Sequence, residues 1–187
     1  MKTKNTILFL FLLFPVAFLF SQEQEEQKKD NFYWGVKAGF NYGSFGAKDI
    51  YSGQKSGLEE SDVYASIFAE YKLNKEFSLQ TELGYSATAE LLYWEFPVLL
   101  KYTFEEKFQV GLGPKISYIS NNYFYGGVEL ITRWGISLQG TAQYNISKHW
   151  LLETSYTYGL NKQLNDYTLG FENGKWRAFR LGFGYKF

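Results

Sequence analysis

Apolar and polar residues alternate along most of this chain from residue 32 onward. The longest such stretch is 128–146, where apolar residues recur at most second positions and small, polar or charged residues stand between them. A helix would place residues i and i+2 on roughly opposite faces, so a period of two predicts β-strands. The pattern predicts eight strands, over 32–43, 62–73, 76–88, 92–104, 107–119, 128–146, 149–160 and 176–187.

The segments between these strands alternate in length. Short polar turns are predicted at 74–75, 105–106 and 147–148, and longer loops at 44–61, 120–127 and 161–175, with a brief connection at 89–91. An even strand number, with short turns on one rim and longer loops on the other, is typical of an up-and-down barrel. The sequence therefore predicts an all-β fold, an eight-stranded antiparallel up-and-down β-barrel.

A soluble barrel with an apolar interior would show the same alternation, so the direction of each face needs separate evidence. The polar face is rich in glycine, which suits a crowded interior, and aromatic residues gather on the apolar face near both strand ends. The chain also ends on alternating Phe183, Tyr185 and Phe187, which resembles the C-terminal assembly signal of outer-membrane barrels. These features favour a transmembrane barrel whose partners are outer-membrane lipid and, during biogenesis, the barrel-assembly machinery.

The first residues have the pattern of a secretory signal peptide. Lys2 and Lys4 precede an apolar run over 7–20, and Ser21 stands before a charged segment. An uncleaved helical anchor is the alternative, but this run is shorter than the roughly 20 residues of a spanning helix. We expect a signal peptide at 1–21 that is cleaved, a periplasmic tether at 22–31 and the barrel at 32–187. The expected location is the outer membrane, with both termini in the periplasm.

Composition excludes several classes of protein. The 187 residues include 19 acidic and 19 basic side chains, no cysteine and one histidine, and 21% of them are aromatic. Balanced charge without a basic cluster gives no reason to expect nucleic acid. Without cysteine there is no disulfide, thiol nucleophile or acylated cysteine. His149 lies in or beside a turn, so the sequence predicts no catalytic residue, metal site or cofactor, and no enzyme.

Charged residues fall on the polar face of the predicted strands, which points into the lumen. They comprise six basic and four acidic groups: Lys37, Glu70, Lys72, Glu82, Glu95, Lys101, Lys115, Arg133, Glu153 and Arg180. An eight-stranded interior is just wide enough for side chains, and unpaired buried charge is costly. We expect a salt-bridged plug, and the alternative is a narrow ion or solute path lined by the positive excess.

Pro97 and Pro114 lie inside predicted neighbouring strands at nearly the same height. Proline removes a hydrogen bond from the ladder, so the sequence predicts a bulge that bends the wall. The alternative is a soft seam used for docking or lateral opening.

Three segments resemble the PorT-like outer-membrane β-barrel family. They are YWEFPVLLKY at 93–102, GLGPKISY at 111–118 and GVKAGFN at 35–41, and the resemblance covers about 32–187. It implies an eight-stranded outer-membrane barrel and, through the family's namesake, a link to type IX secretion and surface export. Such a role would rest on analogy of fold, because one fold serves many functions.

The sequence thus predicts a non-enzymatic outer-membrane protein with a structural or accessory role in the envelope and a partner that it does not name. The alternative is a narrow passive channel for ions or small solutes. Tyr, Asn and Gly in the longer loops fit either interfacial and turn positions or an adaptable binding surface.

Overall fold

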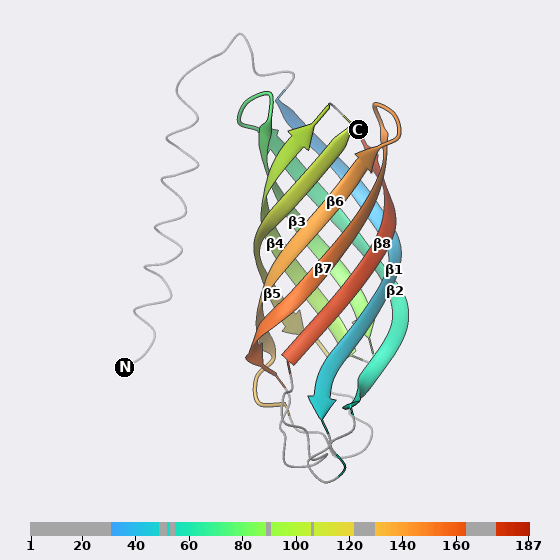
Figure 1. The fold of residues 1–187 in the computed structure, drawn as a ribbon, viewed down its shortest axis with the longest axis vertical. Helices are drawn as coiled ribbons and strands as arrows, with labels where there is room; N and C mark the ends of the chain where they lie inside the picture. Colours follow the sequence, from blue (N-terminus) through green and yellow to red (C-terminus); the bar gives the residue numbers. More distant parts are fainter. Residues whose placement is uncertain are drawn as a thin grey trace, which may run out of the picture. The chain divides into compact units, whose positions relative to one another are not determined.

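The computed structural model describes residues 31–48, 52, 55–88, 91–105, 107–121, 130–163 and 175–187. It contains eight strands: β1 Phe32–Lys48, β2 Lys55–Lys72, β3 Phe77–Thr88, β4 Leu91–Phe104, β5 Phe108–Ile119, β6 Trp134–Asn145, β7 Trp150–Lys162 and β8 Lys175–Lys186. They form one closed barrel in chain order (Figure 1). The predicted all-β, eight-stranded antiparallel barrel is confirmed. The predicted signal peptide, and all of the tether except Asn31, lie outside the described residues.

The barrel closes between its first and last strands. β1 and β8 pair antiparallel from Gly35 opposite Lys186 to Gly46 opposite Lys175. The amide of Phe187 also donates to the carbonyl of Trp34 at 3.0 Å. The end of β8 therefore lies beside the start of β1, on the rim that carries the turns at 73–76, 105–107 and 146–149 (Figure 1). We call this end the short-turn rim and the opposite end the long-loop rim.

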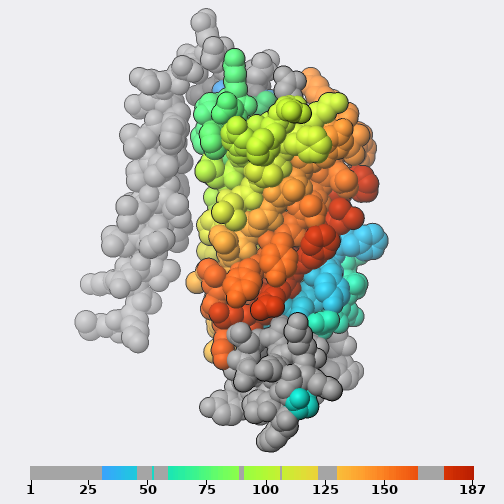
Figure 2. Space-filling model, in the orientation of Figure 1, coloured from blue at the N-terminus to red at the C-terminus, as the bar shows by residue number. Residues whose placement is uncertain are grey.

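Side chains alternate between the two faces of every strand, as the period of two predicts. In β4, for example, Glu95 and Lys101 are buried inside while Trp94 and Leu100 are exposed outside. Large apolar residues cover the outer face with exposed fractions between 36% and 71%, and Figure 2 shows one side of this surface. Within the described residues, no helix is long and apolar enough to span a membrane.

Aromatic side chains form two bands on the outer face. Near the short-turn rim, Trp34 stacks on Phe187 with ring centres 4.2 Å apart, and Trp150 meets Tyr185 at 5.1 Å. Nearer the long-loop rim, Tyr85, Trp94, Tyr118 and Trp134 occupy directly paired positions across β3 to β6. Such bands suit the two interfaces of a bilayer, where aromatic rings meet both hydrocarbon and polar headgroups.

Several strand boundaries differ from those that the sequence predicts. β1 and β2 continue into the predicted loop at 44–61 and stay paired up to Lys48 and Lys55. Period-two apolar signal is absent there because the segment is polar and glycine-rich. β6 begins at Trp134 rather than 128, because Ile131 and Thr132 reverse the alternation and Thr132 Oγ1 accepts the amide of Trp134 at 3.2 Å. Most of the predicted loops 120–127 and 161–175 lies outside the described residues.

The predicted bulge at the two prolines is wrong. Pro97 pairs with Lys115, and pairing resumes at Leu100 and Leu112 in the same register. The missing amides interrupt the ladder without inserting a residue, so the wall keeps its alignment. The register instead shifts between β7 and β8, in the segment between Tyr158 and Lys162.

Candidate functional site: the barrel interior

Eight charged side chains fill the middle of the barrel. They comprise four basic and four acidic residues, contributed by all strands except β6: Lys37, Glu70, Glu82, Glu95, Lys101, Lys115, Glu153 and Arg180. Each side chain is at most 8% exposed, and each takes part in at least one ion pair. We call this set the lumen network.

Lys37 joins three strands at the centre of the network. Its Nζ lies 2.6 Å from Glu82 Oε1 on β3 and 2.8 Å from Glu153 Oε2 on β7. The ammonium group also lies 4.9 Å from the centre of the Phe68 ring, on β2. Gln80 donates to the same Glu82 oxygen, and Ser66 donates to the other at 3.2 Å. A single buried cation is thus matched by two carboxylates, of which Glu82 also accepts from Gln80 and Ser66.

Nearer the short-turn rim, Lys101 on β4 pairs with Glu70 on β2. The Nζ–Oε2 distance is 3.6 Å, and Lys101 also donates to Gln80 at 2.8 Å and to Gln143 at 2.6 Å. Glu70 Oε1 accepts from Ser78 at 2.8 Å. The pair therefore connects β2, β3, β4 and β6 across the interior.

Nearer the long-loop rim, Glu95 on β4 forms ion pairs with two cationic side chains. Lys115 Nζ lies 2.8 Å from Glu95 Oε1 and donates to Thr157 on β7 at 2.8 Å. Arg180 on β8 pairs with Glu95 Oε2 and donates through Nε to Asn41 Oδ1 at 2.8 Å. Since β4 and β8 lie on opposite sides of the eight-stranded wall, these bonds brace the barrel across its width.

Two of the ten predicted lumen charges lie outside this network. Lys72 is exposed at the end of β2, with its Nζ 4.9 Å from the centre of the Tyr33 ring. Arg133 precedes β6, is half-buried and donates to the carbonyl of Ile119 at 3.1 Å. Strand alternation alone cannot place residues at or beyond a strand end. The lumen network itself balances four basic against four acidic groups, and the two further positive groups of the prediction, Lys72 and Arg133, lie at or beyond strand ends.

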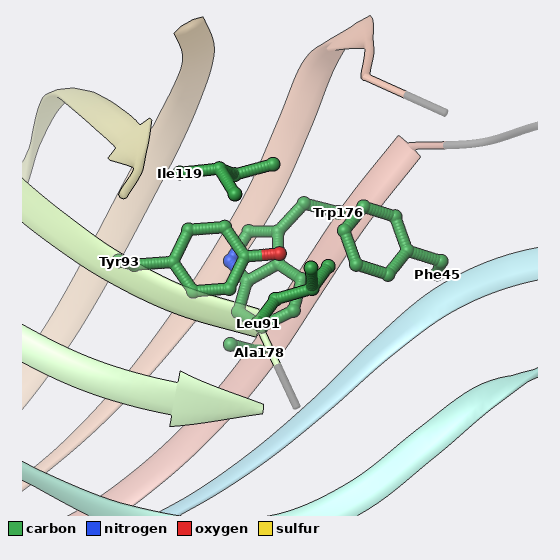
Figure 3. Close-up of a cluster of buried hydrophobic side chains, with 6 residues drawn as sticks. All are labelled: Phe45, Leu91, Tyr93, Ile119, Trp176 and Ala178. Atoms are coloured by element: carbon green, nitrogen blue, oxygen red, sulfur yellow. The ribbon is translucent and has the colours of Figure 1, made fainter. Parts of the chain in front are cut away.

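An apolar cluster closes the lumen on the long-loop side, and the alternation of the strands did not predict it. Its members point inward from β1, β4, β5 and β8, and Figure 3 shows how they pack: Phe45, Leu91, Tyr93, Ile119, Trp176 and Ala178. The rings of Tyr93 and Trp176 lie 4.7 Å apart, and those of Phe45 and Trp176 lie 5.1 Å apart. We call this cluster the apolar cap. Its signal in the sequence is aromatic residues on the polar face of the strand pattern, as at Tyr93.

His149 lies in the turn between β6 and β7, away from the lumen network. Its Nδ1 bonds to the carbonyl of Lys186 at 2.9 Å, and its ring stacks on Tyr185 at 5.5 Å. In the parts of the chain that the structure describes, no group of three or more His, Cys, Asp or Glu residues could hold a metal ion. The chemistry of the interior is thus that of paired charges and amides.

A closed barrel with an apolar outer face, two aromatic bands and a polar interior defines a transmembrane β-barrel. The sequence matches the model of the outer membrane protein beta-barrel domain over residues 10–187, and the chain belongs to that family. Membership in this family indicates an outer-membrane location. No curated protein sequence matches the chain.

Solved structures of similar fold are distant in sequence. OprG from Pseudomonas aeruginosa is 17% identical with a TM-score of 0.50, over 84% of this chain and 96% of that one. A de novo designed transmembrane β-barrel is 12% identical with a TM-score of 0.50, over 86% and 98%. Ail of Yersinia pestis, solved with the heparin analogue sucrose octasulfate, is 16% identical with a TM-score of 0.48, over 84% and 99%. At these identities the likeness extends to the fold alone.

Proposed function

We propose that this protein is a closed outer-membrane barrel with a structural or accessory role in the cell envelope, and that it is not an enzyme. The observation that carries the proposal is the filled interior. The lumen network pairs all eight of its charges, and the apolar cap packs aromatic rings across the lumen on the long-loop side of the network. Water and ions would have to displace several buried ion pairs to pass, which costs several kcal/mol for each buried charge.

Export and orientation are parts of the same proposal. Residues 1–21 would act as a cleaved signal peptide and 22–31 as a periplasmic tether, with both termini of the mature protein in the periplasm. The C-terminal residues Phe183, Tyr185 and Phe187 would be recognised by the barrel-assembly machinery. Phe183 lies on the outer face of β8 and Phe187 directly follows the strand; this supports the proposal because their exposed rings are available before lipid surrounds them.

The proposal also includes an envelope partner. Resemblance to the PorT-like family favours a component of surface export of the type IX kind. A narrow passive channel is the alternative function, and the balance of charge in the lumen network weighs against it.

Crosslinking in living cells tests the accessory role. The tagged protein and an unrelated outer-membrane barrel of equal abundance would be crosslinked, purified in denaturant and compared by mass spectrometry. The proposal predicts envelope proteins that are recovered with this barrel and not with the control. Recovery of the assembly machinery alone, at equal levels for both barrels, would contradict an accessory role.

A further inference from the structure

The short-turn rim encloses a polar cavity of about 660 Å³. This volume is within the usual range of small-molecule sites, roughly 300–1,000 Å³. Its lining includes Glu70 of the lumen network and four lysines, Lys72, Lys75, Lys148 and Lys186. The cavity is thus the mouth of the barrel lumen at this rim, and the lumen network lies beyond it.

The charge of this mouth is positive. Glu70, the carboxylate in its lining, pairs with Lys101, accepts from Ser78 and also attracts the nearby Lys186, so it offsets only part of the charge of the four lysines. Lys186 donates to Asn145 Oδ1 at 3.1 Å, and Lys72 lies over the Tyr33 ring. Within the described residues, no ion pair joins any of the four lysines to a carboxylate. Four ammonium groups around one concave surface favour an anion with more than one negative charge.

A buried amide in the lining of the same cavity is a second, independent indication of a ligand. Gln109 is 4% exposed, and its Nε2 faces Glu70 Oε1 at 3.4 Å and Thr103 Oγ1 at 3.2 Å. A carboxylate can only accept, so the amide nitrogen must face Glu70, and the orientation of the amide is fixed. Gln109 Oε1 is buried and has no hydrogen-bond partner among the described residues. A ligand that reaches this oxygen, which a shift of the Gln109 side chain would expose to the cavity, must bring a donor, such as a hydroxyl group.

We propose that the short-turn mouth binds a small phosphorylated solute that also carries hydroxyl groups, of the size of a sugar phosphate. The phosphate would lie among the four lysines, since ammonium groups bind phosphate as point charges. A hydroxyl group would donate to Gln109 Oε1. Because the lumen network and the apolar cap close the barrel beyond this cavity, the ligand binds at the mouth and does not pass. The inference concerns the mouth alone and does not depend on the accessory role.

Calorimetric titration tests this site, with the full-length protein purified from outer membranes in neutral detergent. The probes are glucose-6-phosphate, glucose and inorganic phosphate. We expect saturable binding of glucose-6-phosphate, weaker binding of inorganic phosphate and none of glucose. Affinity for glucose-6-phosphate should fall as salt rises from about 20 mM to about 200 mM, because the charges of an open mouth are screened.

Variants separate the two parts of the site. Lys72→Gln combined with Lys186→Gln should weaken glucose-6-phosphate binding at least about tenfold, because two of the four charges are lost. Lys107→Gln is the matched control, since Lys107 is exposed on the same rim and does not line the cavity. Gln109→Met removes the acceptor while keeping the side chain's length, and should reduce the preference for glucose-6-phosphate over inorganic phosphate. Heat-dependent gel mobility would check that each variant is folded.

Three results would overturn the proposal. The first is no saturable binding of glucose-6-phosphate, and the second is equal affinity in the double lysine variant and the Lys107→Gln control. The third is loss of glucose-6-phosphate binding when the protein is in nanodiscs of phosphatidylglycerol but not of phosphatidylcholine. Competition by the anionic lipid would assign the mouth to a lipid headgroup. An unchanged preference in folded Gln109→Met would refute the hydroxyl contact.

Discussion

Replacing Glu95 by Gln is the sharpest perturbation of the lumen network. Glu95 is 1% exposed in its side chain and pairs with both Lys115 and Arg180, which are 0% and 8% exposed. The amide of glutamine is nearly the same size but has one acceptor oxygen, so its NH₂ group must face one of the two cations. That cation then stays buried without its counter-charge.

The magnitude follows from this geometry. Removing one partner of a buried ion pair costs about 3–5 kcal/mol. Arg180 keeps its bonds to Asn41 and Ser86, and Lys115 keeps Thr157, so the lower end of that range is expected. A loss of about 3 kcal/mol lowers the folding equilibrium constant by roughly a hundredfold or more.

Urea unfolding in phospholipid vesicles would measure this loss, with the five tryptophans as fluorescent reporters. Glu76→Gln is the control, because Glu76 is an exposed carboxylate in the turn before β3 and should change stability by less than about 0.5 kcal/mol. Combining Glu95→Gln with Lys115→Gln restores equal numbers of positive and negative groups and should recover part of the loss. A Glu95→Gln barrel as stable as the Glu76→Gln barrel would refute the view that the buried charges are paired and matched.

Three further predictions concern the wall of the barrel. Gly113→Ala should destabilise the barrel by about 1–3 kcal/mol in the same unfolding assay, because the added Cβ would clash with the carbonyl oxygen of Val98 and lie 2.9 Å from its carbonyl carbon. The control is inward-facing Gly84→Ala, whose Cβ would have its nearest atom at 3.5 Å and which should be nearly neutral. Equal losses of stability in the two variants would contradict the packing argument. Phe187→Ala should lower the amount of folded barrel in cells, measured by heat-dependent gel mobility, whereas lipid-facing Phe40→Ala should not lower it. Equal effects of the two substitutions would argue against an assembly signal at the C-terminus. If Pro97 and Pro114 form a soft seam, amide hydrogen exchange at 95–99 and 112–116 should be faster than in the other strands, and exchange no faster there would remove the seam.

The strands and their faces could be predicted because the bilayer imposes a simple rule. Each residue faces either lipid or a filled lumen, so polarity alone assigns its direction, as for Glu95 inside and Trp94 outside. The rule fails where a strand leaves this environment. The polar continuation of β1 to Lys48 and of β2 from Lys55 has no apolar face to reveal it.

The site was predictable in its residue types and not in its pairing. Alternation placed Lys37, Glu82 and Glu153 inside, but which carboxylates meet Lys37 depends on the stagger of strands around the barrel. The apolar cap was missed for a different reason. Phe45 and Trp176 belong to the inward set, where aromatic residues are unexpected, and only the closed barrel brings β1 and β8 together.

Conductance across a planar lipid bilayer measures whether the lumen of this barrel is closed. The purified protein would be inserted into bilayers under an applied voltage, with an open porin as the positive control. We expect no steady conductance, because the lumen network and the apolar cap fill the barrel. Stable conductance steps that are lost when Arg133 is replaced by Ala, or that change in Glu95→Gln, would contradict a closed lumen and favour the passive channel.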